Sequence, residues 1–237
     1  VLVIYFGKGK LHLSFKDRYI LDFKMIARIV NVGLPAFIEQ FIMQGGFLVM
    51  QIMIISMGTV QSASYQIGVN VNSFAFMPIF GFAIAATTMV GQNLGSQHYE
   101  DAEMYARATN RLAVAVITVI GILTFIFAKP LTMLYTTDVG VIGMSMAIIR
   151  IFSSVDPVLG VMNVCSGVLR AAGDIMYVMV TALVGLWLFR VLIAYLLHHF
   201  FGLGIYGVMI GVAADFTVRA CMYGLRVRAG RWKSLKV

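Results

Sequence analysis

Several charged side chains stand inside long apolar stretches of this sequence, and they are its most informative candidates for chemistry. Glu39 follows Pro35 by four residues. Asp156 directly precedes Pro157, and Arg190 lies in the middle of a later apolar stretch. An ionised group is costly in hydrocarbon unless it is paired or hydrated, so each of these residues is a candidate for binding or ion coupling.

Glu39 is accompanied by two amides, Gln40 and Gln44, which a helix places on neighbouring faces. An acid in this setting can carry a proton, hold a cation or bind a basic substrate. Alternatively, Glu39 pairs with a basic residue of the preceding segment or lies in headgroup water. The sequence leaves both interpretations open.

Asp156 has a proline as its next residue. Pro157 removes a backbone N–H and frees carbonyl oxygens beside the carboxylate, which suits a cation or proton site. The alternative is a structural ion pair, either with Arg150 or with a base on another helix.

The remaining charges within apolar stretches favour structural roles. Arg190 must face the helix bundle or a cavity, where we expect an acid from another helix beside it. It is kept as a binding candidate, although a structural partnership is the favoured role. Asp215 and Arg219 are four residues apart, a spacing that predicts a local ion pair on one helix.

A further polar group lies in the second apolar stretch. Asn70 and Asn72 are followed by Pro78 and Gly81. Amides followed by such breakers are expected where a helix bends and lines a polar cavity. They also suit hydrogen bonds that hold helices together.

The composition predicts the elements that must position these residues. Apolar residues make up 60% of the 237-residue chain, charged residues only 12%, and the mean hydropathy is +0.91. Soluble domains have about 45–50% apolar and about 25% charged residues. The ~10-residue alternation of barrel strands does not occur. We therefore expect an all-α integral membrane protein.

Six transmembrane helices are predicted, at residues 33–57, 65–89, 110–128, 141–165, 176–197 and 205–223. At ~1.5 Å per residue, each can cross a ~30 Å hydrocarbon core. Lys and Arg gather on alternate connections: Lys8, Lys10, Lys16, Arg18, Lys24, Arg28, Arg107, Arg111, Arg170, Arg219, Arg226, Arg228, Arg231, Lys233 and Lys236. This bias predicts a multi-pass plasma-membrane protein with both ends of the six-helix unit in the cytoplasm.

The same pattern divides the chain into three parts. Residues 1–32 are predicted to be the end of a preceding helix plus a cytoplasmic linker, because residues 1–6 are apolar and a basic segment follows. Residues 33–226 form the six-helix lobe, and residues 227–237 form a basic cytoplasmic tail.

Several functions have little support. The net charge of +8 comes from short segments between apolar stretches, so it indicates membrane topology rather than nucleic-acid binding. The four His residues show no metal-ligand spacing, and neither a phosphate-binding loop nor a nucleophile–base motif is present. We expect no enzyme and no cofactor.

Three stretches are more distinctive than composition. The first is QIGVN at 66–70 with FMPIFGFAIAATTMVGQNLGS at 76–96, and the second is SGVLRAAGD at 166–174. The third is Asp215 and Arg219 followed by GRWK at 230–233. In this order they closely resemble the carboxy-terminal lobe of the multidrug and toxic compound extrusion (MATE) family.

The resemblance implies one lobe of a twelve-helix, two-lobe (inverted-V) transporter that works by alternating access. It implies a secondary active efflux antiporter for small amphiphilic or cationic substrates, coupled to H⁺ or Na⁺. Its partners are then the lipid bilayer and the missing amino-terminal lobe, without which we expect no transport.

The loop motifs of the resemblance also have physical interpretations. Gly91 and Gly95 are expected to let the chain leave its helix and turn tightly. Arg170 and Asp174 are expected to fix the later loop by a charge pair, with Gly173 permitting the turn. These residues are predicted to hold helix ends and an inward gate rather than substrate.

Two other functions remain as alternatives. A lipid-linked oligosaccharide flippase of the same superfamily would need a large basic cavity, whereas the predicted spans contain few bases, Arg150 and Arg190 among them. A non-transporting membrane scaffold would have no solvent-accessible acid within its spans. Accessibility labelling at Glu39 and Asp156 distinguishes the scaffold from a transporter.

Overall fold

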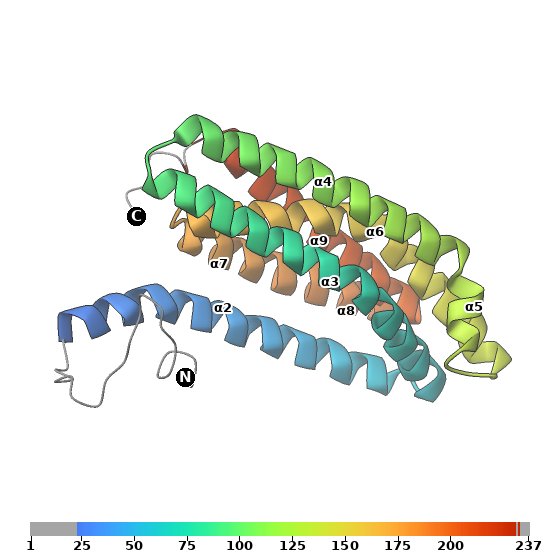
Figure 1. The fold of residues 1–237 in the computed structure, drawn as a ribbon. Helices are drawn as coiled ribbons and strands as arrows, with labels where there is room; N and C mark the ends of the chain where they lie inside the picture. Colours follow the sequence, from blue (N-terminus) through green and yellow to red (C-terminus); the bar gives the residue numbers. More distant parts are fainter. Residues whose placement is uncertain (1–22, 231, 233–237) are drawn as a thin grey trace, which may run out of the picture. The chain divides into compact units, whose positions relative to one another are not determined.

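The computed structural model describes residues 23–230 and 232, and every regular element within them is a helix (Figure 1). The elements are α2 (Phe23–Ser56), α3 (Thr59–Gly95), α4 (Tyr99–Ile126), α5 (Ala128–Met133), α6 (Val139–Ala171), α7 (Ile175–Leu183), η1 (Val184–Val191), α8 (Leu192–His199) and α9 (Gly204–Arg228). The described residues 23–34, which form the first part of α2, belong to a separate unit. The packing below is that of the unit from residue 35 onward.

The prediction of six membrane helices is confirmed. Six helical segments of the described chain are long and apolar enough to cross a bilayer, and each overlaps one predicted span. The fifth consists of α7, η1 and α8 in continuous succession over Ile175–His199. The short helix α5 was not predicted, and the predicted linker and tail lie largely outside the described residues.

Helix α6 is the central element of the bundle. It packs along α3, α4 and α9, while η1 and α8 pack on α9. Small residues permit the closest approaches: a Cβ added to Gly167 would lie 2.7 Å from the Ala83 carbonyl oxygen of α3. A Cβ on Gly211 of α9 would lie equally close, 2.7 Å, to the Arg190 carbonyl oxygen. Such contacts are typical of membrane helices, whose association depends on close backbone packing.

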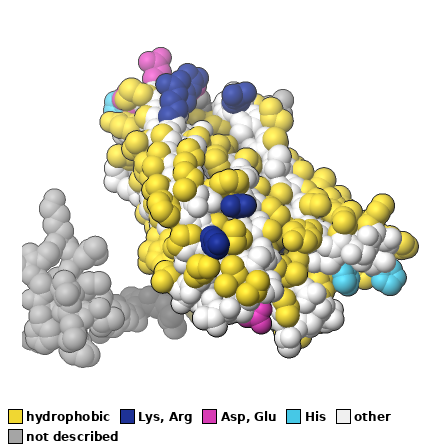
Figure 2. Space-filling model, turned by 90° about the vertical axis from the view of Figure 1, so that its right-hand side faces the viewer, with side chains coloured by type: hydrophobic (Ala, Val, Ile, Leu, Met, Phe, Trp, Pro, Cys, Tyr) yellow, Lys and Arg dark blue, Asp and Glu magenta, His cyan; other side chains and the backbone are white. Residues whose placement is uncertain are grey.

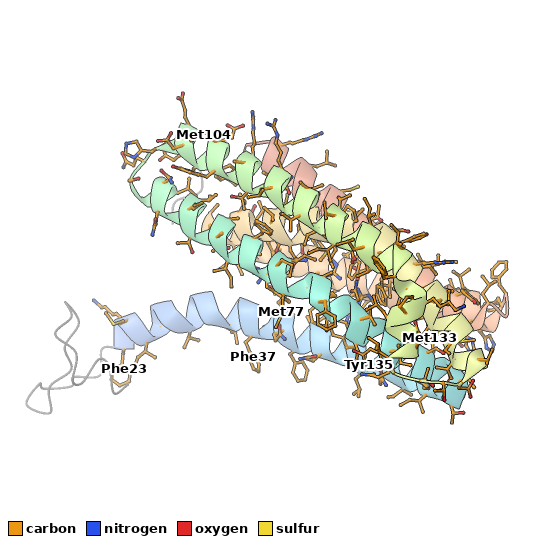
Figure 3. All side chains as sticks on the ribbon, turned by 45° about the vertical axis from the view of Figure 1, so that its right-hand side comes forward. Phe23, Phe37, Met77, Met104, Met133 and Tyr135 are labelled. Atoms are coloured by element: carbon orange, nitrogen blue, oxygen red, sulfur yellow. The ribbon has the colours of Figure 1, made fainter. Side chains whose placement is uncertain are left out.

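The outer surface is apolar while the interior contains polar groups. Hydrophobic side chains cover most of the face in Figure 2, where Lys and Arg occur only in small groups. Phe37 is 66% exposed and Met77 is 79% exposed. Met133 and Tyr135, at the α5 end of the bundle, are also exposed (Figure 3). This distribution suits a lipid-facing surface.

Of the two turns predicted from glycine residues, the turn after α3 differs from the prediction and the turn after α6 agrees with it. Helix α3 continues through Gly91 to Gly95, so neither glycine makes the turn, which instead passes through Gln97 at a φ of 63°. Local hydrogen bonds hold that turn, including one from the His98 amide to the Asn93 carbonyl oxygen. After α6, however, Gly173 adopts a φ of 80° and does permit the expected turn.

Candidate functional site

A cavity of about 590 Å³ lies between α2, α3, α6, η1 and α9. Aromatic and Met side chains make up much of its wall, among them Phe76 and Phe80 of α3 and Met162 of α6. Ligand sites in proteins are generally cavities of about 300–1,000 Å³ with largely apolar walls and a few polar groups. The cavity can therefore hold a small amphiphilic molecule.

The structure brings many of the predicted site residues together in this wall. They are Glu39, Gln40, Gln44, Asn72, Arg170, Arg190 and Arg219. Asp156 and Asp215 do not line the cavity but contact residues that do. The remaining candidates, Asn70, Gly91, Gly95, Gly173 and Asp174, lie outside the cavity lining.

Two arginines of the wall share one buried carboxylate. Arg190 Nη2 lies 2.8 Å from Asp215 Oδ2, although without hydrogen-bond geometry. Arg219 donates to both Asp215 oxygens, with its Nε 2.5 Å from Oδ1. Phe216 lies beside both guanidinium groups, and its ring centroid is 4.8 Å from Arg190 Cζ. The expected acid partner of Arg190 and the Asp215–Arg219 pair are both present.

Arg190 belongs to a π-helical segment, η1, that the sequence did not predict. Such segments are rare and often occur at functional sites. Gly185 of the same segment contacts the charged cluster closely: a Cβ added there would clash with Asp215 Oδ1 and lie 2.6 Å from Arg219 Cγ. Helix α9 can therefore place its ion pair against η1 only because residue 185 has no side chain.

Asp156 lies directly behind the cavity wall. It is 1% exposed, and its Oδ1 accepts a hydrogen bond of 2.9 Å from Asn72 Nδ2. Asp156 Oδ2 and Asn72 Oδ1 have no hydrogen-bond partner among the described residues. The alternative pairing with Arg150 is wrong, because Arg150 is exposed and stacks over the Phe125 ring at 5.3 Å.

Glu39 is linked to the far end of α6, while most bases of the preceding segment lie outside the described residues. Its Oε1 accepts a hydrogen bond of 2.5 Å from Arg170 Nη2. The predicted charge pair between Arg170 and Asp174 is therefore wrong, and Asp174 accepts a 2.8 Å hydrogen bond from Arg226 Nε. The physical reason is that α6 ends at Ala171, so helical i,i+4 spacing no longer applies at Asp174.

The electrostatic balance of the wall is mildly positive. Arg170, Arg190 and Arg219 line the cavity, and Glu39 and Asp215 neutralise two of the three charges. Each base therefore lies in contact with an acid. A cation entering the cavity also meets aromatic faces, which attract positive charge.

Sequence reasoning missed several residues of the wall. Phe47, Phe216 and Met43 line the cavity, and Met43 Sδ lies 3.7 Å from Arg219 Nη1. Apolar residues in an apolar helix give no local contrast, so these positions had no signal. Gln51 and Asn163 also line the cavity, and their polar side chains within apolar stretches were a weak signal.

The described residues offer little for a metal. No group of three or more His, Cys, Asp or Glu side chains gathers within residues 23–230 and 232. Asp156 Oδ2 and Asn72 Oδ1 are buried acceptors without a hydrogen-bond partner among the described residues.

Comparison with known proteins identifies similar sequences. The family model described as MatE matches residues 35–196. The chain is 30% identical over 209 residues to the "Probable multidrug resistance protein NorM" of Thermotoga maritima, covering 88% of this chain and 45% of that protein. It is 28% identical to the "Multidrug resistance protein MdtK" of Edwardsiella ictaluri, with coverages of 87% and 46%.

Solved structures show the same fold. The "Crystal structure of MATE in the bent conformation" superposes with a TM-score of 0.86 at 19% identity, covering 98% of this chain and 52% of that one. The "MATE transporter ClbM in complex with Rb+" gives a TM-score of 0.81 at 22% identity, covering 90% and 50%. The chain thus spans about half the length of the relatives it matches.

Proposed function

Because the chain belongs to the MatE family, we propose that it is the carboxy-terminal lobe of a secondary active multidrug efflux antiporter. The transporter exchanges small amphiphilic or cationic substrates for H⁺ or Na⁺ across the plasma membrane, with both ends of this lobe in the cytoplasm. It has no enzymatic role. The observation that carries the proposal is the cavity of about 590 Å³, which is lined by residues of five helical elements.

The character of the cavity wall supports amphiphilic substrates. Aromatic rings such as Phe76 and Phe80 offer faces to organic cations, and Met43 and Met162 can adapt to different shapes. Adaptable Met-rich surfaces are typical of binders with broad specificity. Gln40 and Gln44 add hydrogen-bonding groups without adding charge.

Two acids support ion coupling. Glu39 lines the cavity, and the buried Asp156 retains one oxygen without a hydrogen-bond partner among the described residues. A carboxylate in this position must gain a proton, a cation or a hydrogen-bond donor to offset its desolvation. Proton or Na⁺ binding at Asp156 would act on the cavity through its hydrogen bond with Asn72.

A second lobe is part of the proposal. Alternating access in two-lobe transporters rocks one helical bundle against the other around a central site. This chain contains one six-helix lobe, and its multidrug relatives are about twice its length. We therefore expect an amino-terminal lobe, in the same polypeptide or in another, to face this one across the central site.

The test is efflux of ethidium, an organic cation, from cells that make a two-lobe protein with this chain as its carboxy-terminal half. Na⁺ and H⁺ gradients are imposed in turn. Efflux is expected with one gradient, and it should fall to background in Asp156→Asn and in the chain produced alone. Asp138→Asn is the matched control, because Asp138 is exposed and caps the start of α6, and asparagine is also a good cap.

The outcomes separate the alternatives. If Asp156→Asn and Glu39→Gln both pump at the normal rate, these acids are structural and coupling resides in the other lobe. If well-inserted protein transports no cation, the antiporter proposal is wrong. Transport of a lipid-linked oligosaccharide by that protein would establish the flippase instead. The observation that favours a flippase is the net positive charge that Arg170, Arg190 and Arg219 leave after pairing with two acids.

A further inference from the structure

A second cavity lies between α4, α6 and α9. Its volume is about 680 Å³. Helices α4 and α9 each pack along α6, with no extensive contact between each other among the described residues. They form the two walls of a crevice, and Val161, Val164 and Val168 of α6 contribute an apolar floor.

Arginines gather at one end of this crevice. Arg107 and Arg111 lie one turn apart on α4, and Arg228 is the last residue of α9. All three are exposed. Glu103 pairs with Arg107, whereas no ion pair of Arg111 or Arg228 occurs within the described part of the chain. The four side chains together carry two net positive charges.

The arginines mark one boundary of the hydrocarbon layer. Residues 112–126 of α4 continue from Arg111 without a charged side chain, over about 22 Å at ~1.5 Å per residue. Leu112, the next residue of α4, is 57% exposed, and Leu225 on the α9 wall of the crevice is 66% exposed. A long basic side chain at such a boundary extends toward the headgroups while its stem stays in apolar surroundings.

Two details indicate a ligand with a headgroup and a chain. Asn110, between the two α4 arginines, has an Oδ1 that is buried and accepts no hydrogen bond from the described residues. Gly224 lines the crevice, and a Cβ added there would meet nothing within 4 Å. The crevice thus offers cationic donors, one unused acceptor and open apolar space.

We propose that this crevice binds one anionic phospholipid of the phosphatidylglycerol type. Its phosphate lies among Arg107, Arg111 and Arg228, a headgroup hydroxyl donates to Asn110 Oδ1, and one acyl chain lies against α6. Basic pockets between membrane helices on the cytoplasmic side bind anionic headgroups in this way. Unlike the cavity of the proposed transport site, this crevice needs only the membrane as a source of its ligand, and the proposal is independent of transport.

The test is native mass spectrometry of the purified chain in mild detergent, with phosphatidylglycerol or phosphatidylcholine of identical acyl chains added. We expect preferential binding of phosphatidylglycerol, with an affinity about 30-fold lower in the double variant Arg111→Gln/Arg228→Gln. Arg150→Gln is the matched control, because Arg150 is an exposed arginine of α6 outside the crevice. Gly224→Phe should reduce lipid binding equally while keeping every charge.

Several results would overturn the proposal. They are equal binding of the two lipids, unchanged phosphatidylglycerol binding in the double variant, or inorganic phosphate that displaces the lipid at millimolar concentration.

A second measurement avoids the arginine variants altogether. The variant Trp187→Phe keeps one tryptophan, the buried Trp232 at the crevice. Brominated phosphatidylglycerol at low mole fraction should quench the fluorescence of Trp232 more than brominated phosphatidylcholine does. Equal quenching by the two lipids also contradicts selective binding.

Discussion

Replacing Asp215 with Asn should strongly destabilise the lobe, because it removes the carboxylate that Arg190 and Arg219 share. The side chains of these three residues are 0%, 4% and 5% exposed, respectively. Removing one partner of a buried ion pair costs roughly 3–5 kcal/mol, since the other charge is left uncompensated. Both arginines also reach the cavity, where water can solvate them, so we expect about 3 kcal/mol.

The reciprocal change should be milder. Arg190→Met leaves Asp215 in its two-point interaction with Arg219 and replaces a buried cation with an apolar chain of similar length. Substituting buried ionic groups with apolar residues is often neutral, so we expect a cost of about 1 kcal/mol or less. In the double variant the two effects should not add, because one of the stranded charges is then absent.

The assay is equilibrium unfolding of the purified chain in mixed detergent and SDS micelles, followed by circular dichroism. The three variants and the unaltered protein give a double-mutant cycle with an expected coupling of at least about 1 kcal/mol. A loss below about 1 kcal/mol in Asp215→Asn would refute the reasoning. It would mean that the cavity hydrates both arginines well enough for the shared carboxylate to be dispensable.

Two further changes can be measured in the same assay. Glu39→Gln should cost no more than about 1 kcal/mol, because its partner Arg170 is 49% exposed, and the difference should shrink in high salt. Gly167→Ala should cost about 1–3 kcal/mol, because its Cβ would meet the α3 backbone, whereas Gly81→Ala has nothing within 4 Å and serves as control. A larger loss in Glu39→Gln than in Gly167→Ala would contradict both assignments.

The positions of the helices could be predicted because bilayer crossing is a local property of the sequence. The predicted span 205–223, for example, lies inside α9, Gly204–Arg228. The ends of the helices were harder to predict, because polar residues can continue a helix beyond the hydrocarbon layer. Helix α4 begins at Tyr99 rather than at 110, and Glu100 and Asp101 in its first turn favour that start.

The charge pairs show where local reasoning stops. The Asp215–Arg219 pair was predicted because its residues share one helix at i,i+4. Glu39 and Arg170 are 131 residues apart, so their contact depends on where the fold places α2 relative to the end of α6. The π-helical turn at η1 had no signal either, because it depends on how the helix packs on α9.

The same pairs indicate that charged and uncharged residues have different roles in the cavity between α2, α3, α6, η1 and α9. Arg190, Arg219 and Arg170 each contact an acid, so their charges are largely used in holding η1, α9, α6 and α2 together. The groups left to meet a substrate are amides such as Gln44 and aromatic rings such as Phe80, which carry no net charge. A wall built in this way distinguishes ligands by shape and by local polarity more than by total charge. Changes to the arginines and Asp215 should therefore alter stability first, whereas changes to the amides and rings should alter which amphiphiles bind.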